Sequence, residues 1–132
     1  MEIGVYCTSI RPHLWDRLYK SLSQNSVDFN LCIAGPCPPI APLPGNVKYI
    51  STNVKPSQCW FIAANNTKGD YVLQVTDDVT FSTGTLDNLV NILSKESKAI
   101  VCPTYKSDDT FESHFSFTTE FPWEREDKTA QT

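Results

Sequence analysis

Two adjacent carboxylates, Asp77 and Asp78, follow an apolar run at residues 71–75 after a single threonine, and they are the side chains best placed for chemistry. Two aspartates at the end of a buried strand repel each other and carry a desolvation cost unless something neutralises them. Mg²⁺ and Mn²⁺ suit such a position, because they prefer carboxylate oxygens and often complete their coordination with substrate phosphates. The pair therefore indicates a cation site that receives a diphosphate; the alternative is an ordinary turn before the next helix.

The elements that must position this pair alternate between strands and helices. The apolar patterns predict strands at residues 3–7, 29–34, 47–50, 71–75 and 99–102, with amphipathic helices between them. This order predicts an α/β fold, a mainly parallel sheet of about five strands with helices on both faces. The carboxyl ends of such strands share one edge of the sheet, where ligands of open α/β folds bind. That edge is expected to carry hydroxyls, a guanidinium, an ammonium and the two carboxylates, from residues 8–11, 35–36, 51–55 and 76–78.

Composition excludes several classes of function. The 132 residues carry 11 Lys and Arg against 15 Asp and Glu, and no Lys/Arg cluster is present, which argues against binding to nucleic acid. No apolar run approaches the ~18 residues of a transmembrane helix, and the first residues lack the features of a secretory signal, so the expected location is the cytoplasm. Five cysteines without a C-x-x-C motif and only two histidines give a zinc site almost no support.

The segment NNTKGDYVLQVTDDVTFSTGTLDNLV, residues 65–90, resembles the central region of nucleotide-sugar-dependent glycosyltransferases of the family-2 type, which have the glycosyltransferase-A fold. Gly-Asp at 69–70 precedes the apolar strand, and Thr-Asp-Asp at 76–78 stands where the family has its acidic metal motif. The loop Thr-Ser-Ile-Arg-Pro at 8–12 is similar to the family's first, nucleotide-binding loop. The resemblance covers about residues 3–105, the nucleotide-binding half of the family.

The resemblance implies that the chain binds a nucleotide-diphosphate sugar with Mn²⁺ or Mg²⁺ and transfers the sugar, as a hexosyltransferase-like enzyme, to an unknown acceptor. Asp78 would be the direct metal ligand, and Asp77 would face the ribose or uracil and contribute to the metal site. Thr8 and Arg11 would border the nucleotide, and Lys55 matches a basic position that helps to hold the base or the diphosphate. Each of these three residues also has a structural alternative. Thr8 would only cap the loop, Arg11 would be a solvated residue at the start of a helix, and Lys55 would be an exposed surface lysine.

The sequence departs from the family pattern in two places. Gly-Pro at 35–36 ends the second strand, where an acidic residue commonly reads the base, so the identity of the base stays open. The family also has an acceptor-binding half with a carboxylate base, which suggests that this chain is a minimal or truncated glycosyltransferase. Glu124, Glu126 and Asp127, in the segment WEREDK, resemble the family's Glu-Asp acceptor motif but come early in the chain, and Glu124 and Asp127 are the candidates kept from this segment. They are the candidates for that base, and a solvated charged terminus is the alternative.

Residues 1–105 are expected to form the nucleotide-sugar-binding α/β domain, and residues 106–132 an extension of it. In that extension, aromatic residues alternate with polar ones, which predicts an antiparallel or edge strand; they are Phe111, Phe115, Phe117, Phe121 and Trp123. Side chains of this size are expected to cover either the sheet edge or a second copy of the chain, and the second option would form a homodimer.

Two rivals to the enzyme hypothesis remain. The first is a non-catalytic module of the same fold, which binds a nucleotide or a protein partner without transferring a sugar. The second is a generic flavodoxin-like domain, whose sheet edge would bind a flat ring without a metal ion. The presence of a carboxylate that faces Asp78 across a cleft would favour the enzyme over both.

Overall fold

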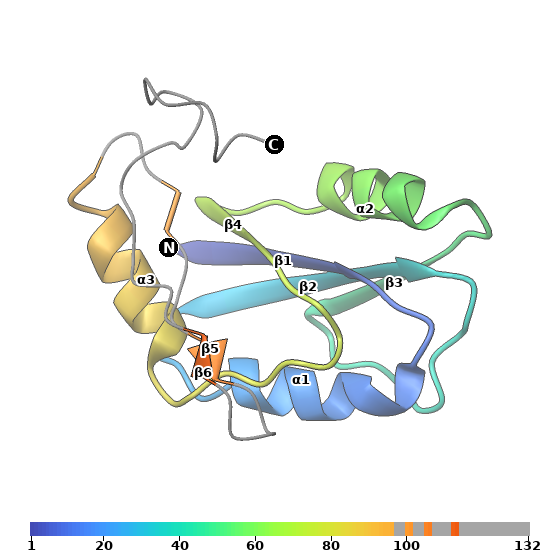
Figure 1. Cartoon of the computed structure of the whole chain (residues 1–132), viewed down its shortest axis with the longest axis horizontal. Coiled ribbons are helices and arrows are strands. Elements are labelled where there is room, and N and C mark those ends of the chain that lie inside the picture. Colours follow the sequence, from blue (N-terminus) through green and yellow to red (C-terminus); the bar gives the residue numbers. More distant parts are fainter. Residues whose placement is uncertain (97–99, 102–104, 107–111, 114–132) are drawn as a thin grey trace. The chain divides into compact units, whose positions relative to one another are not determined.

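The computed structural model describes residues 1–96, 100–101, 105–106 and 112–113. The chain divides into two compact units, Met1–Leu86 and Asp87–Thr132. The elements in chain order (Figure 1) are β1 (Glu2–Thr8), the 3₁₀ helix η1 (Pro12–Leu14), α1 (Trp15–Leu22), β2 (Asp28–Gly35), β3 (Val47–Ser51), α2 (Pro56–Asn65), β4 (Tyr71–Gln74), α3 (Thr85–Leu93), β5 (Tyr105–Lys106) and β6 (Glu112–Ser113).

The first unit is built around a four-stranded sheet with the order β3-β2-β1-β4. All three strand pairs are parallel, and β1 lies between β2 and β4, so that Tyr6 is opposite Cys32 on one side and Gln74 on the other. This arrangement confirms the predicted α/β fold and the first four predicted strands. It also confirms that the carboxyl ends of these strands lie at one edge of the sheet, here called the carboxyl edge.

Alternate residues of the strands face different helices. On one face, the Phe29 ring of β2 lies 5.5 Å from that of Tyr19 in α1. On the other face, small β2 side chains pack against small side chains of α2; the cluster contains Cys32, Ala34, Cys59 and Ala63. Figure 1 accordingly shows α1 and α2 on opposite sides of the strands. Helices on both faces were expected, because runs of buried strand residues without polar alternation need cover on both sides.

The prediction of a fifth strand at residues 99–102 is wrong. Of these residues the structure describes Ile100 and Val101, and neither belongs to a strand. Ile100 is 40% exposed, unlike a residue of a buried central strand. A short apolar run shows that a segment can be buried, but it does not supply a neighbouring strand to pair with. The parallel sheet in the described part of the chain therefore has four strands, not about five.

The second unit is described only in part. β5 and β6 form a short antiparallel pair, with Tyr105 opposite Ser113, in the stretch where the sequence predicts an antiparallel or edge strand. The five aromatic residues of the extension lie outside the described residues, so their predicted packing and the homodimer stay predictions, as does the division at residue 105. Along the described stretches, no helix combines the length and apolarity needed to cross a membrane.

Candidate functional site

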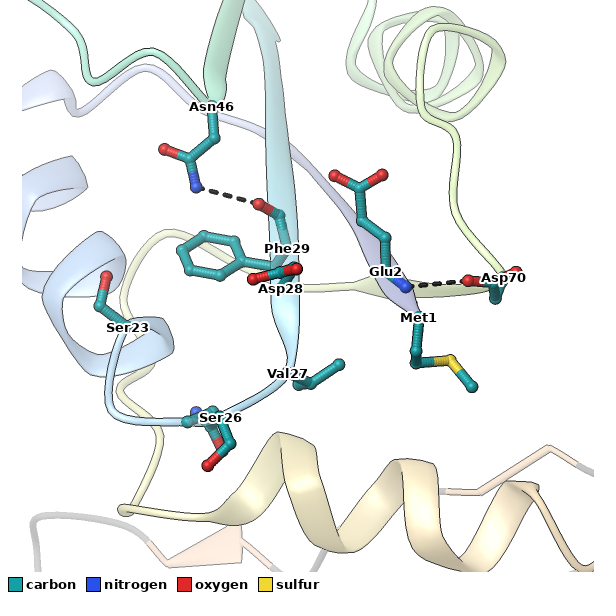
Figure 2. A pocket seen from close by; sticks show the side chains of 10 residues that line it. Met1, Glu2, Ser23, Ser26, Val27, Asp28, Phe29, Asn46 and Asp70 are labelled. Carbon is teal, nitrogen blue, oxygen red and sulfur yellow. Dashed lines mark hydrogen bonds between the residues drawn. The ribbon is translucent and has the colours of Figure 1, made fainter.

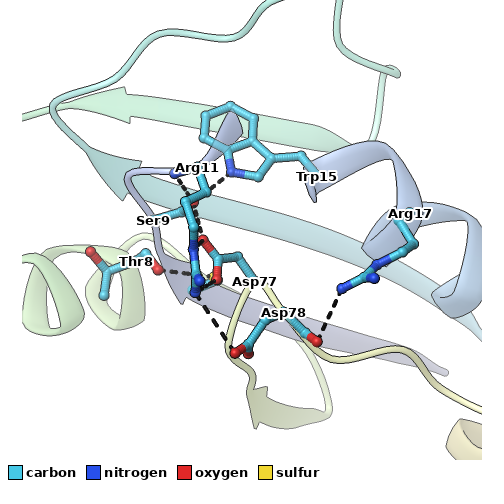
Figure 3. A network of polar contacts seen from close by, with 8 residues as sticks. Thr8, Ser9, Arg11, Trp15, Arg17, Asp77 and Asp78 are labelled. Atoms are coloured by element: carbon cyan, nitrogen blue, oxygen red, sulfur yellow. Dashed lines mark hydrogen bonds and ion pairs between the residues drawn. The ribbon is translucent and has the colours of Figure 1, made fainter. Parts of the chain in front are cut away.

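The candidate site lies where β1 and β4 end side by side at the carboxyl edge. The β1–β4 ladder continues past the strand with a hydrogen bond of 3.0 Å from the Val75 N–H to the Tyr6 carbonyl. The chain then turns at Asp77 and Asp78, next to the loop that follows β1 (Figure 3). Because the two strands are direct neighbours, groups far apart in the sequence meet here.

Asp77 is the buried centre of this site, with 3% of its surface exposed. Its Oδ2 accepts hydrogen bonds from the Ser9 hydroxyl at 2.7 Å and from Arg11 Nε at 3.1 Å. Its Oδ1 accepts a third hydrogen bond, from Arg11 Nη2. The guanidinium thus binds the carboxylate with two nitrogens, a geometry that is stronger than a single contact and fixes the relative orientation of the groups. Asp77 is therefore a buried carboxylate that accepts three hydrogen bonds.

Ser9 links this carboxylate to the first helix. While its hydroxyl donates to Asp77, the same oxygen accepts from Trp15 Nε1 at 2.7 Å and from the Arg11 backbone N–H at 3.0 Å. One donor and two acceptor positions are all that a hydroxyl offers, so every one is used. Trp15 is itself buried in α1. The loop, the helix and the carboxylate are consequently held together by one buried oxygen.

Gly35 allows the β1 loop to cross the end of β2. A Cβ atom at this position would lie 2.2 Å from the Ser9 carbonyl oxygen, which is much closer than real Cβ contacts. Only glycine therefore fits beneath Ser9 without moving the backbone. This contact gives a physical reason for glycine at the point where the family pattern has an acidic residue.

Asp78 lies on the solvent side of the same network. Its side chain is 54% exposed, and its Oδ2 is 3.8 Å from Arg11 Nη2. Its backbone carbonyl accepts a hydrogen bond of 3.1 Å from Arg17 Nη2. Arg11, whose side chain is 47% exposed, therefore forms ion pairs with both aspartates. The positive charge that pairs with the two carboxylates in this structure is a guanidinium, which offsets one of their two negative charges.

Two groups at the site have shifted pKa values. The hydrogen bond with Asp77, reinforced by their attraction, raises the pKa of Arg11 and keeps its positive charge. Burial, assisted by the charges of Asp77 and Asp78, raises the pKa of Cys7 to about 12. Because the thiolate is the nucleophilic form, Cys7 is an inert thiol at neutral pH.

The other predicted site residues fall into two groups. Thr8 is next to the network, but its hydroxyl donates to the Ala34 carbonyl at 2.9 Å and so holds the loop against β2. Lys55 is exposed and precedes the first residue of α2; among the described residues it forms no ion pair with either aspartate. Glu124 and Asp127 lie outside the described residues, and their role as a catalytic base stays a prediction.

The sequence placed Ser9 at this edge, within residues 8–11, but gave it no role, and it did not identify Trp15 or Arg17 as residues of the site. Trp15 fitted the apolar face of the first helix, and its N–H was not considered. A buried indole N–H usually has a hydrogen-bond partner, so a tryptophan near a polar loop is a signal that could have found Ser9. For Arg17, whose partner is a backbone carbonyl, the sequence contains no such signal.

Two cavities of the first unit lie away from the two aspartates. One of about 610 Å³ opens at the amino ends of the strands and is lined by Glu2, Asp28 and Asp70 (Figure 2). Another, of about 290 Å³, lies between α1 and the proline-rich loop after β2. Neither is lined by Asp77 or Asp78. The convergence of charged side chains, not the volume of a hollow, therefore marks the carboxyl edge.

The donor atoms of the site suit a hard divalent cation in kind, because both aspartates offer carboxylate oxygens. Asp78 is accessible, whereas Asp77 is engaged by Ser9 and Arg11. Among the described residues, no cluster of three or more His, Cys, Asp or Glu side chains could hold a metal ion. A cation could thus use Asp78 directly and would reach Asp77 only after Arg11 had moved.

Comparisons with known proteins agree with this fold. The chain is similar to the crystal structure of S. aureus TarS 1–349, with a TM-score of 0.60 and 18% sequence identity. The match covers 74% of this chain and 33% of that one, so the chain spans about a third of the length of the TarS structure. No curated protein sequence matches the chain. A model of glycosyl transferase family 2 matches residues 12–131, nearly the whole chain. The chain therefore belongs to glycosyl transferase family 2.

Proposed function

We propose that the chain binds the diphosphate of a nucleotide-diphosphate sugar at the carboxyl edge, together with Mn²⁺ or Mg²⁺, and takes part in transferring the sugar to an acceptor. The observation that carries this proposal is the cluster of Arg11, Asp77 and Asp78 at the ligand-binding edge of a family-2 chain. Opposite charges in one place can receive both a cation and an anionic diphosphate.

Each charged group has a distinct part in this proposal. Asp78 would hold the cation with an exposed carboxylate, and Asp77 would contribute once it is accessible. Arg11 would bind a diphosphate oxygen, and Lys55, at the start of α2, would bind the base or the diphosphate. Thr8 would border the nucleotide. When bound, the divalent cation would stabilise the charge that develops on the departing nucleoside diphosphate.

Transfer also needs a base for the acceptor hydroxyl. A general base must lie within hydrogen-bond reach of the proton that it removes. Asp77 is a poor candidate, because its carboxylate is buried and its hydrogen bonds are already made. Glu124 and Asp127 are the candidates that we propose for this step.

A second function is a nucleotide-binding module that does not catalyse transfer. A specific observation favours it: in this structure Arg11 already pairs with both aspartates and offsets one of their two negative charges without a metal ion. This function predicts binding that does not depend on Mn²⁺ and no release of nucleoside diphosphate from a nucleotide sugar.

The proposal is tested by calorimetric titration of the protein with nucleoside diphosphates such as UDP, with and without Mn²⁺. Binding should be measurable only with the metal ion. Asp78→Asn keeps the shape of the side chain but removes a charged metal ligand. Loss of even an outer-shell partner weakens metal sites by about 10- to 100-fold, so this variant should lose at least about tenfold in affinity.

Asp28→Asn is the matched control, because Asp28 is an exposed aspartate that lines the cavity at the opposite edge. It should bind the nucleotide as the wild type does. Asp78→Asn should unfold at nearly the same denaturant concentration as the wild type, since the Asp78 side chain is half exposed. Equal affinity with and without Mn²⁺, or equal affinity of both variants, would contradict metal-dependent binding. Binding without sugar transfer to any acceptor or to water would favour the non-catalytic module.

A further inference from the structure

We propose that Arg11 limits metal binding at this site, because its guanidinium pairs with both Asp77 and Asp78 and so occupies the position of a divalent cation that would be held by both carboxylates. The inference rests on the proposed function and deepens it. It states that Arg11 and the cation compete for the Asp77 carboxylate, so that a cation held by the exposed Asp78 also reaches Asp77 only when Arg11 leaves.

The hydrogen bonds of Asp77 carry the first step. Each carboxylate oxygen has about two acceptor positions. Both positions of Oδ2 are used, by Ser9 at 2.7 Å and by Arg11 Nε at 3.1 Å, and Oδ1 accepts from Arg11 Nη2. The carboxylate is 3% exposed, whereas the Arg11 side chain is 47% exposed. The guanidinium is therefore the more accessible member of this pair, and Figure 3 shows its contacts with both aspartates.

The charges carry the second step. A divalent cation between the two carboxylates would be in direct repulsion with the guanidinium that pairs with both. Loss of a proton from Arg11 cannot relieve this repulsion, because arginine stays charged in proteins. Arg11 must move, and it remains tethered in the loop after β1, beside the place that a diphosphate would occupy. Once released from Asp77, the guanidinium could bind an oxygen of the diphosphate instead.

Ser9 and Trp15 make this exchange compatible with a fixed site. When Arg11 leaves, Asp77 keeps the hydrogen bond from the Ser9 hydroxyl, which is itself held by the buried Trp15 indole at 2.7 Å. Asp77 can therefore exchange one cation for another without changing its own position. The metal ion alone should bind weakly, because it displaces an existing ion pair. In the presence of a nucleoside diphosphate it should bind more tightly, since Arg11 then has another partner, and the two ligands should strengthen each other reciprocally.

The decisive measurement is the affinity for Mn²⁺ without any nucleotide, followed by paramagnetic resonance of free Mn²⁺. Arg11→Gln removes the competing charge. A neighbouring arginine lowers the proton affinity of a carboxylate by about 10- to 1,000-fold, and Mn²⁺ uses the same lone pairs, so this variant should bind Mn²⁺ at least about tenfold more tightly than the wild type.

Arg17→Gln is the matched control for Arg11→Gln. It removes the same charge nearby, but Arg17 contacts only the backbone carbonyl of Asp78 and pairs with neither carboxylate among the described residues. Its affinity for Mn²⁺ should equal that of the wild type. The competition is refuted by an unchanged or weaker affinity in Arg11→Gln, by an equal gain in both variants, or by a lack of Mn²⁺ binding in all three proteins.

A second measurement uses the wild type, because Arg11→Gln leaves a buried carboxylate without its charged partner and lowers stability. The Nε–H group of Arg11 gives a nuclear magnetic resonance signal that is identified by its loss in Arg11→Lys. Saturating Mg²⁺ should shift this signal, since the hydrogen bond to Asp77 breaks. An unshifted signal in protein saturated with Mg²⁺ would overturn the inference.

Failure of this inference can be told apart from failure of the proposed function. Tighter Mn²⁺ binding by Arg11→Gln, together with no nucleotide binding by the wild type, would support the competition and reject the nucleotide-sugar site. Metal-dependent nucleotide binding by the wild type, together with an unchanged Arg11 signal, would support the proposed function and reject the competition.

Discussion

The two edges of the central sheet carry similar residue types but use them differently. At the amino edge, where the strands begin, Glu2, Asp28 and Asp70 line the larger cavity. The polar side chains there serve the backbone: Asp70 Oδ2 accepts from the Glu2 N–H at 2.8 Å, and Asn46 Nδ2 donates to the Phe29 carbonyl at 2.9 Å (Figure 2). These contacts close the ends of strands, which is a structural role.

At the carboxyl edge, side chains bond to one another instead. Asp77 is buried and accepts from Ser9 and Arg11, and Asp78 adds a second carboxylate that is open to solvent. A buried charge is costly unless it is paired and hydrogen-bonded, so such an arrangement persists only where the fold holds every partner in place. The comparison teaches that the two edges differ in the pairing of their carboxylates, and this pairing, not the size of a cavity, is why we propose the carboxyl edge as the functional one.

The largest effect on stability is expected from Gly35→Ala, which tests whether the carboxyl edge is the more tightly built of the two. Its Cβ would lie 2.2 Å from the Ser9 carbonyl oxygen, so the loop after β1 must move. Overpacking of this kind costs about 1–3 kcal/mol in free energy of unfolding. We expect a loss of about 3 kcal/mol here, because the atom that the Cβ would contact belongs to the backbone and cannot rotate away. Urea denaturation gives the loss directly.

Gly45→Ala is the control for this substitution, because Gly45 precedes β3 near the amino edge and an added Cβ would meet nothing within 4 Å. Its free energy of unfolding should stay within about 1 kcal/mol of the wild type or rise slightly, since alanine restricts the unfolded chain. Equal losses in the two variants would show that the edges do not differ in this respect.

A smaller effect is expected from Ser9→Ala, which breaks the hydrogen-bond network without adding volume. The buried Trp15 N–H and one oxygen of Asp77 then lose a partner. A buried polar group left unsatisfied costs about 1–3 kcal/mol, so we expect a loss of about 2 kcal/mol in free energy of unfolding. Ser23→Ala, at the cavity of the amino edge, removes an exposed hydroxyl that bonds to the Tyr19 carbonyl. Its effect should stay within about 0.5 kcal/mol, and a larger loss there than for Ser9→Ala would reverse the comparison.

The smallest expected effect is a loss of folding stability at alkaline pH, caused by Cys7 next to the carboxyl edge. Burial raises the pKa of Cys7 from 9.0, the value for an unburied thiol, to about 12 in the folded protein. Between these values the unfolded chain releases the thiol proton and the folded protein keeps it, so stability is complete below pH 9 and falls as pH rises above it. The loss should be about 1.4 kcal/mol per pH unit. Urea unfolding at pH 8 and pH 10 measures it.

Cys7→Ala removes the titrating group and should remove this part of the pH dependence, whatever its own effect on stability at pH 8. For each protein the comparison uses only the difference in free energy of unfolding between pH 8 and pH 10. The destabilisation by the small cavity that the substitution leaves is the same at both pH values and therefore cancels. If the wild type and the variant lost the same free energy of unfolding between pH 8 and pH 10, Cys7 would not keep its proton in the folded protein.

Much of the fold could be predicted from the pattern of apolar residues. Continuous apolar runs at β1, β2 and β4, with amphipathic helices between them, leave a parallel sheet covered on both faces as the natural solution. Parallel strands then bring residues 8–11 and 76–78 to one edge. The pattern was wrong at residues 99–102, because pairing depends on a neighbouring strand that an apolar run does not specify.

What the sequence determined by itself is the set of groups at the carboxyl edge, because the position of a residue just after a strand follows from local pattern and chain direction. Only the tertiary structure decided how those groups are paired. Arg11 and Asp77 are 66 positions apart, and their contact depends on β1 and β4 being neighbours and on Gly35 letting the Ser9 loop pass. The sequence showed two carboxylates in need of a positive charge. That a guanidinium supplies it follows from distances and burial, which no local pattern encodes.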